Sequence, residues 1–151
     1  MQRILCLDIG DKRTGVAVSD PLGITAQSVE TIFTKGRDKD AARVAELAEK
    51  YQTRRILCGL PRRLSGEEGL QAAKVREFAA VLAEKGFEVR FMDERLTSVS
   101  AERVLIGAGV RRDSRKNVID KLAAAFILQD YLDMGGWKEA SQADSGNQEV
   151  Q

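Results

Sequence analysis

The chain has 151 residues, with 24 Lys and Arg against 23 Asp and Glu, and it contains no histidine. This length predicts one domain with a core of its own and leaves little room for a second. Because histidine is absent, the sequence excludes Ser-His-Asp triads, Cys-His pairs and zinc held by imidazole. An enzyme built on this chain must use carboxylates, lysine, hydroxyls, thiols or a metal ion with oxygen ligands.

The two cysteines lie inside short apolar runs, Cys6 in residues 4–9 and Cys58 in residues 56–60. We therefore expect two small buried side chains and neither a disulfide nor a metal site. The N-terminus leads directly into a strand without a basic and apolar leader, and no apolar run is long enough to span a bilayer. These features predict a cytoplasmic protein with no membrane partner.

The first part of the chain has the pattern of three strands. Residues 3–9 form an apolar run with the length of a central strand, and residues 14–19 follow after a turn that contains Gly10. Residues 20–23 place Asp, Pro and Gly where a type I turn favours them, and residues 29–33 can form the next strand. The order predicts an antiparallel meander.

Helices and strands alternate in the rest of the chain. Apolar residues recur at helical spacing over residues 40–51 and 70–82, whereas the apolar runs 55–60 and 87–92 have the length of strands. The remaining expected elements are a helix at 98–106 with Thr97 or Ser98 as N-cap, a basic loop at 110–117, and a last helix at 118–134 before Gly135 and Gly136. We predict an α/β fold with a mixed five-stranded sheet, three strands antiparallel and two parallel, flanked by helices.

The C-terminal residues 138–151 differ in composition from the rest of the chain. They are polar, lack periodicity, and carry Glu139, Asp144 and Glu149 against Lys138. We expect a domain over residues 1–137 followed by a disordered tail. The net charge of +1 averages this acidic tail with a basic segment before it.

Asp8 stands where core formation alone would not place a charge. It ends the first strand on the side that also carries Ile4 and Cys6. Carboxylates are almost never fully buried without a partner. Taken alone, Asp8 is most simply interpreted as a turn-forming residue that bonds to the Gly10 backbone.

Asp93 and Glu94 close the fifth predicted strand. Open α/β sheets bind ligands at the carboxyl ends of their parallel strands. Alternation sends the two side chains to opposite faces, so that one can join Asp8 while the other braces the loop or Arg95. The alternative is a solvated acidic loop whose charge Arg95 balances.

Asp120 shares a face of the last predicted helix with Ala123, Ala124, Ile127 and Tyr131. A negative charge in the first turn of a helix is favourable, which explains the position of Asp120 along the helix but not its face. Converging carboxylates repel one another unless a cation lies between them.

Three such carboxylates would suit a hard divalent cation, Mg²⁺ or Mn²⁺. Two ions of this kind can hydrolyse a phosphodiester without histidine. The basic residues just before Asp120 would attract a polyanion, although a solubilising loop is the alternative; they are Arg111, Arg112, Arg115 and Lys116.

Four motifs in order resemble the YqgF family of bacterial proteins, also described as pre-16S rRNA nucleases and RuvX-type Holliday junction resolvase homologues. The motifs are LDIGDKRTGVAVSD at residues 7–20, Gly59-Leu60-Pro61 with Gly66, DERLTS at residues 93–98, and Arg115-Lys116 with Ile119-Asp120 and the helix up to residue 129. The resemblance covers residues 3–133. It implies an RNase H-like fold with a metal-dependent nuclease site.

The resemblance also implies roles for single residues. Asp8, Glu94 and Asp120 match the family's catalytic carboxylates and would hold the metal ion, and Asp93 would be the bracing member of its pair. The candidates for contact with phosphate are Lys12, Arg13, Arg95, Arg115 and Lys116. No acidic residue after Asp120 lies close enough along the helix to act as a fourth carboxylate, so the number of metal ions stays open.

The function implied is an endonuclease that processes the 5′ end of pre-16S ribosomal RNA. One alternative is a Holliday junction resolvase acting on branched DNA, which requires a homodimer rather than a monomer. Another is an ATPase of the actin or hexokinase type, because residues 8–10 resemble its phosphate-binding turn, but that class needs two such domains. A third is a catalytically idle RNA-binding assembly factor; aromatic content of only 5% argues against base stacking as its main device.

Overall fold

The computed structural model describes residues 2–97, 112–139 and 149–150, and the side chains of all these except 112–121 and 149–150. In chain order the elements are β1 (Ile4–Ile9), β2 (Arg13–Ser19), β3 (Ala26–Phe33), α1 (Arg37–Lys50), β4 (Arg55–Leu60), α2 (Leu70–Glu84), β5 (Glu88–Asp93), the 3-10 turn η1 (Glu94–Leu96), α4 (Arg112–Asp133) and β6 (Glu149–Val150). Among the described residues, no helix combines the length and apolar character needed to cross a membrane.

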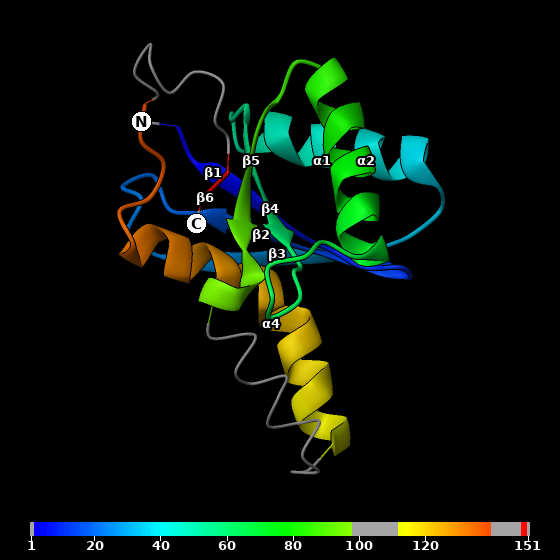
Figure 1. The fold of residues 1–151 in the computed structure, drawn as a ribbon. Coiled ribbons are helices and arrows are strands. Elements are labelled where there is room, and N and C mark those ends of the chain that lie inside the picture. The colour runs from blue at the N-terminus through cyan, green and yellow to red at the C-terminus, as the bar shows by residue number, and fades with distance from the viewer. Residues whose placement is uncertain (1, 98–111, 140–148, 151) are drawn as a thin grey trace.

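One sheet with the strand order β3-β2-β1-β4-β5-β6 forms the centre of the molecule. The pairs β1 with β2 and β2 with β3 are antiparallel, whereas β1 with β4 and β4 with β5 are parallel. Figure 1 shows α1 and α2 on one face of the sheet and α4 on the other. The predicted mixed sheet of five strands, with these directions, is confirmed.

Two apolar layers cover the faces of the sheet. Because side chains alternate along a strand, Leu5 and Leu7 of β1 pack in the layer under α1 and α2, whereas Ile4 and Cys6 pack in the layer under α4. Asp8 follows the parity of Cys6 and is therefore directed to the face that carries α4. All six residues of β4 are buried, as expected of a strand between two parallel neighbours.

Both cysteines are buried and free, as predicted. Cys6 belongs to the layer under α4 and Cys58 to the layer under α1 and α2, so the two side chains lie on opposite faces of the sheet. Burial raises the pKa of Cys58 to about 12.

The last helix differs from its predicted start. We expected a loop at 110–117 and a helix from 118, but α4 already begins at Arg112. Residues 111–117 contain no apolar side chain, so periodicity could not reveal a helix there, although Arg and Lys have good helix propensity. The predicted helix at 98–106 lies outside the described residues.

The chain after α4 is attached to the sheet where the structure describes it. Trp137 is buried in the layer under α4, its Nε1 donates to Glu88 at 3.2 Å, and the Arg90 guanidinium lies 4.2 Å from its ring centroid. Glu139 forms an ion pair with Arg55.

β6 lies in the segment for which we predicted disorder, and it pairs in parallel with β5. For these two residues the prediction is wrong. β5 would otherwise be an edge strand with unpaired backbone groups, and side-chain periodicity does not reveal which segment covers such an edge. The disorder predicted for residues 140–148 and 151 lies outside the described residues.

Candidate active site

A pocket of about 420 Å³ opens at the ends of β1, β4 and β5. These three strands are parallel, so their carboxyl ends meet at one edge of the sheet, where open α/β sheets bind ligands. The pocket is lined by Asp8, Ile9, Gly10, Asp11, Lys12, Arg13, Gly15, Pro61, Gln71 and Glu94.

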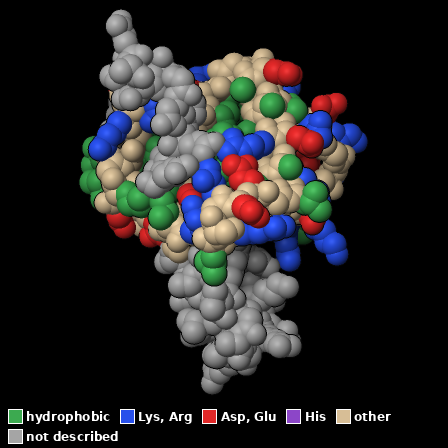
Figure 2. Space-filling model, in the orientation of Figure 1, with side chains coloured by type: hydrophobic (Ala, Val, Ile, Leu, Met, Phe, Trp, Pro, Cys, Tyr) green, Lys and Arg blue, Asp and Glu red, His purple; other side chains and the backbone are tan. Residues whose placement is uncertain are grey.

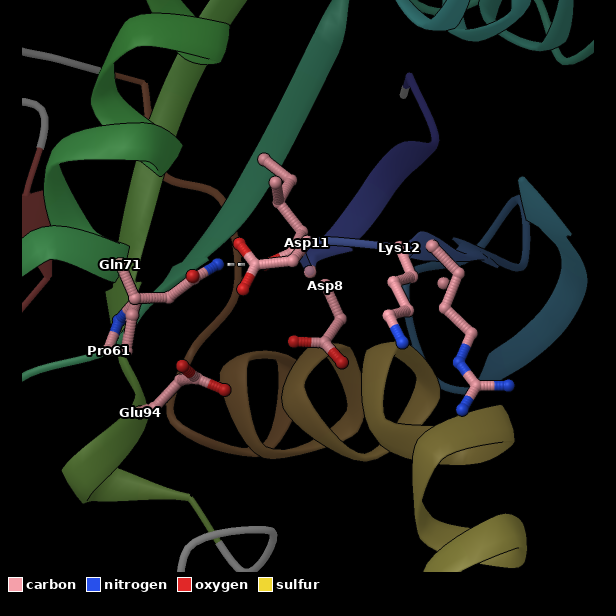
Figure 3. Close-up of a pocket in the computed structure, with 10 residues that line it drawn as sticks. Asp8, Asp11, Lys12, Pro61, Gln71 and Glu94 are labelled. Atoms are coloured by element: carbon pink, nitrogen blue, oxygen red, sulfur yellow. Dashed lines mark hydrogen bonds between the residues drawn. The ribbon is translucent and has the colours of Figure 1, made fainter. Parts of the chain in front are cut away.

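Asp8 and Glu94 face the same pocket although they are 86 residues apart in the sequence. Figure 3 shows both carboxylates turned toward the shared space. Glu94 is buried, with 8% of its surface exposed. Both carboxylates also act on Cys6. Burial raises the pKa of the Cys6 thiol well above its ordinary value, and the charges of Cys58, Asp8 and Glu94 raise it further. The predicted meeting of Asp8 and Glu94 is present.

A short turn holds Glu94 in place. In η1, the carbonyl oxygen of Glu94 accepts a hydrogen bond from the backbone N–H of Thr97 at 3.1 Å and another from its hydroxyl at 2.8 Å. Thr97 is itself buried. The backbone that carries the carboxylate is therefore bonded on both sides, because Asp93 caps the start of the same turn.

Asp120 lies in the described backbone of α4, whereas its side chain lies outside the described residues. Ala123, Ala124, Ile127 and Tyr131, which we predicted on the same helical face, are all buried in the layer against the sheet. This places the helical face, but the approach of the Asp120 carboxylate to the pocket stays a prediction.

The described carboxylates partly meet the requirements of a metal site. Within the described part of the chain, no group of three or more Asp, Glu, Cys or His residues is placed to hold a metal ion. Asp8 and Glu94 supply two carboxylates, and Mg²⁺ is usually held by one or two carboxylates together with water and substrate phosphate. The donor set therefore fits a hard divalent cation, with Asp120 as the predicted third ligand.

Gly59 leaves room for the side chains of Glu94 and Ile127, a role that we did not assign from the sequence. It pairs with Met92 of β5 and follows Cys58, the partner of Leu7 in β1. A Cβ atom at Gly59 would lie 3.0 Å from Cδ1 of Ile127 and 3.5 Å from Cγ of Glu94. A glycine inside an apolar strand is the signal that could have indicated this close approach.

The turn between β1 and β2 presents basic side chains to the pocket. The Gly10 N–H donates to the carbonyl oxygen of Arg13 at 2.9 Å, and a Cβ at Gly10 would lie only 2.8 Å from that oxygen, so glycine is required there. Lys12 and Arg13 both line the pocket, and in Figure 3 the Lys12 side chain points in the same direction as that of Asp8. The structure thus places both beside the site, and their contact with phosphate stays a prediction.

Gln71 is a pocket residue that the sequence interpretation missed. It stands in the first turn of α2, and its Nε2 donates to the carbonyl oxygen of Ile9 at 2.9 Å. One turn further along α2, Lys74 forms an ion pair with Asp11 at 2.8 Å. Both contacts fix the end of β1 to α2. A polar residue at the start of an amphipathic helix has many roles, so no sequence signal distinguished Gln71.

Asp93 braces Arg95, as predicted. Its carboxylate accepts hydrogen bonds from the Arg95 backbone N–H at 2.9 Å and from Nη2 at 2.6 Å. Burial would raise the pKa of Asp93, but the hydrogen bonds from Arg95 and the charges of Arg95 and Arg62 outweigh it, so the pKa is lowered. Arg95 also donates to the carbonyl oxygen of Leu64 at 3.2 Å. The Arg95 guanidinium is thus held by protein groups, and its contact with phosphate stays a prediction.

The other predicted phosphate contacts are less defined. Arg115 and Lys116 lie near the start of α4, but their side chains are outside the described residues. Figure 2 shows Lys and Arg side chains interleaved with Asp and Glu in the middle of the face that carries β5. Basic residues on this face therefore have acidic neighbours.

Comparison with known proteins identifies the family. The family model described as "RuvX: Holliday junction resolvase" matches residues 2–134. The chain belongs to the RuvX family. Two relatives named "Putative pre-16S rRNA nuclease" are those of Lactococcus lactis subsp. cremoris, 50% identical over 87% of this chain and 94% of that protein, and Clostridium kluyveri, 46% identical over 87% and 96%.

The fold of this RuvX-family chain is similar to that of a solved RuvC structure. Thermus thermophilus RuvC superposes with a TM-score of 0.53 at 17% sequence identity, covering 89% of this chain and 97% of that one. At this identity the likeness concerns the fold alone. Together with the strand order and directions, it confirms the RNase H-like architecture.

Proposed function

We propose that this RuvX-family protein is a metal-dependent endonuclease that hydrolyses phosphodiester bonds in pre-16S ribosomal RNA. The observation that carries the proposal is the meeting of Asp8 and Glu94 in one pocket beside Lys12 and Arg13. The names of relatives that are about half identical to this chain support both the activity and the substrate. The two free cysteines suit the reducing cytoplasm that we propose as its location.

Each group of the pocket has a role in this reaction. Asp8 and Glu94, with Asp120 as the third carboxylate, would hold Mg²⁺ or Mn²⁺. A divalent cation there supplies Lewis acidity, which activates water and stabilises the leaving oxygen, so no histidine is needed. Lys12 and Arg13 would neutralise the phosphates on either side of the bond that breaks.

Cys6 lies close to these carboxylates but does not join them as a ligand. It is fully buried in the apolar layer under α4 and does not line the pocket. The pocket therefore offers oxygen ligands, which favours Mg²⁺ or Mn²⁺ over softer ions.

Holliday junction resolution is the second candidate function. The description of the family model and the likeness to the RuvC fold favour it. It would require two copies of the chain that hold two pockets on one four-way junction. A strictly monomeric protein would exclude it.

A cleavage assay with three substrates tests the proposal. Precursor 16S RNA, unstructured single-stranded RNA and a four-way DNA junction are each incubated with Mg²⁺, Mn²⁺ or EDTA. We expect cleavage of the precursor with either ion and none with EDTA. The Asp120→Asn variant should lose about a hundredfold of this activity, because a metal ligand is removed. Preferential cleavage of the junction would favour the second candidate.

A further inference from the structure

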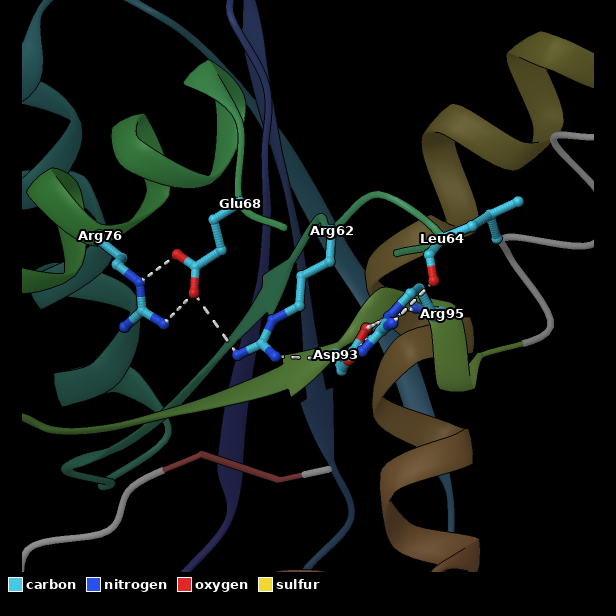
Figure 4. A network of polar contacts seen from close by, with 6 residues as sticks. All are labelled: Arg62, Leu64, Glu68, Arg76, Asp93 and Arg95. Carbon is cyan, nitrogen blue, oxygen red and sulfur yellow. Dashed lines mark hydrogen bonds and ion pairs between the residues drawn. The ribbon is translucent and has the colours of Figure 1, made fainter. Parts of the chain in front are cut away.

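A chain of charged side chains joins α2, the loop between β4 and α2, and the end of β5 (Figure 4). Its members in spatial order are Arg76, Glu68, Arg62, Asp93 and Arg95. None of these five lines the candidate active-site pocket. The family motifs account for Asp93 and Arg95 but not for the other three.

Arg62 is the link in this chain. Arg76 binds Glu68 through two hydrogen bonds of 2.6 and 2.7 Å, and Arg95 binds Asp93 with a shortest contact of 2.6 Å. The Arg62 guanidinium lies between the two pairs, 3.5 Å from Glu68 Oε2 and 4.0 Å from Asp93 Oδ2. Each carboxylate already has an arginine partner, so Arg62 connects two complete ion pairs.

The burial of Arg62 points to a geometric role. Its side chain is 10% exposed, and that of its partner Asp93 is 3% exposed. Taking such charges out of water costs free energy that a buried ion pair recovers only when its geometry is close. The two contacts that form the bridge, at 3.5 and 4.0 Å, are longer than the two ion pairs that they join, at 2.6 Å each. The bridge is therefore explained better by the segments that it connects than by the free energy that it adds.

Arg62 and Asp93 each stand beside a residue of the pocket. Pro61 precedes Arg62 where β4 ends, and Glu94 follows Asp93 where β5 ends; both Pro61 and Glu94 line the pocket. Each pocket residue shares a peptide bond with a residue of the bridge. An ion pair that fixes Arg62 and Asp93 therefore restricts the backbone from which the side chains of Pro61 and Glu94 project.

We propose that Arg62 is a positioning residue for Glu94. By bridging Glu68 and Asp93, it holds the loop between β4 and α2 against the end of β5 and keeps the Glu94 carboxylate turned into the pocket. The inference rests on the proposed function only where it names Glu94 as a metal ligand. Arg62 itself contacts no substrate.

The test uses three variants and one matched control. Arg62→Met removes the bridging charge, Arg62→Lys keeps one charge without the planar fork, and Glu68→Gln weakens the bridge while leaving the pair of Asp93 and Arg95 intact. Arg63→Met is the control, because the neighbouring Arg63 is 70% exposed and pairs with Glu67 at 3.5 Å.

Two measurements are made on each variant in the absence of nucleic acid. The first is hydrogen exchange at the amides of Arg95 and Thr97, which donate to Asp93 Oδ1 and to the Glu94 carbonyl oxygen. The second is the affinity for Mn²⁺ by calorimetry. Cleavage kinetics on precursor RNA then separate kcat from KM.

For Arg62→Met we expect faster exchange at both amides and Mn²⁺ binding weakened about tenfold, as for other residues that orient a metal ligand. The kcat should fall while KM for RNA stays within about twofold, because the substrate contacts are unchanged. Arg62→Lys should lie between this variant and the wild type, and Arg63→Met should match the wild type.

Unchanged exchange in both Arg62→Met and Glu68→Gln would overturn the inference whatever the activity. A raised KM with a smaller salt dependence would also overturn it, since Arg62 would then bind phosphate. Arg62→Met can raise the amide exchange rates while the wild type neither binds Mn²⁺ nor cleaves nucleic acid. In that case the proposed function is wrong, but the inference that Arg62 holds the end of β5 in place stands. Should Arg62→Met fail to fold, Glu68→Gln decides the same question.

Discussion

Gly59 of β4 has no side chain, which leaves room for the side chain of Glu94 at the end of the neighbouring strand β5. In Gly59→Ala, the new Cβ would meet Cδ1 of Ile127 at 3.0 Å, so Ile127 or β4 must move. Overpacking of this kind costs about 1–3 kcal/mol in the free energy of unfolding. Urea denaturation of Gly59→Ala measures the cost.

A second substitution checks the cause. Ile127→Val removes the methyl group that the new Cβ would meet, and alone it should cost about 1 kcal/mol. Combined with Gly59→Ala, it should restore part of the lost stability, so that the double variant is more stable than the sum of the single effects predicts. Strictly additive losses would show that Ile127 is not the group that excludes a side chain at position 59.

Asp93 makes stability depend on pH. Its pKa is lowered in the folded protein, so its contribution is present above the unfolded value of about 3.9 and is lost as the pH falls through the folded value. Asp93→Asn should cost about 3 kcal/mol at pH 7, because Arg62 and Arg95 lose a buried partner. The free energy of unfolding, measured from pH 2.5 to 7, should also fall less steeply below pH 4.

The exposed residue Asp38 of α1 provides the control for this titration. Asp38→Asn should retain the steep acid dependence of the wild type. An Asp93→Asn variant with the same slope below pH 4 as the wild type would contradict the assignment of that dependence to Asp93.

At the level of elements, the segment after α4 is part of the folded domain. Trp137 is the only tryptophan of the chain and lies buried in the layer under α4. Its fluorescence should therefore report global unfolding, and its denaturation curve should coincide with that of far-UV circular dichroism. An earlier fluorescence transition would mean that this segment detaches before the domain unfolds.

Trp137→Ala tests the energy of the same contact. Loss of the buried indole and of its contact with Arg90 should cost about 3 kcal/mol. Thermal and urea denaturation followed by circular dichroism give the value. A cost below about 1 kcal/mol would show that the segment adds little to the domain.

The elements whose side chains alternate or repeat were predictable from the sequence. β4 was predicted to the residue, because all six of its residues are buried, and α2 was predicted from its apolar face. The first turns of α4 were not predictable because they are polar. The strand β6 was not predictable because only its pairing with β5 defines it. Neither a polar helix start nor the pairing of an edge strand produces a periodic pattern of apolar residues in the sequence.

The sequence predicted the carboxylates of the site but not the residues that position them. Asp8 and the pair of Asp93 and Glu94 were identifiable as candidates because carboxylates at the end of an apolar strand are unusual, and the family resemblance then singled out Glu94. Gln71 and Arg62 were not identifiable, since their roles depend on which strand and loop lie beside them in space, and Gly59 stood out only as a glycine inside an apolar strand. Such neighbours become visible only when the sheet order is known.

At the scale of the whole molecule, nucleic-acid binding should depend on the basic turn between β1 and β2. Replacing Lys12 or Arg13 by alanine should reduce the slope of log affinity against log salt concentration by about one each, because one phosphate contact is lost. Filter binding of precursor RNA at several salt concentrations measures the slope. The paired surface residue Arg63 is the control, and an equal loss in Arg63→Ala would contradict a specific role for the turn.

Metal-dependent cleavage of precursor 16S RNA by Asp8→Asn and Glu94→Gln is the most direct test of the two-carboxylate site. The wild type and Asp38→Asn should cleave with Mg²⁺ or Mn²⁺, whereas both site variants should fold normally and lose about a hundredfold or more of the rate. Wild-type cleavage by either folded site variant would contradict the assignment of Asp8 and Glu94 as the residues that hold the metal ion.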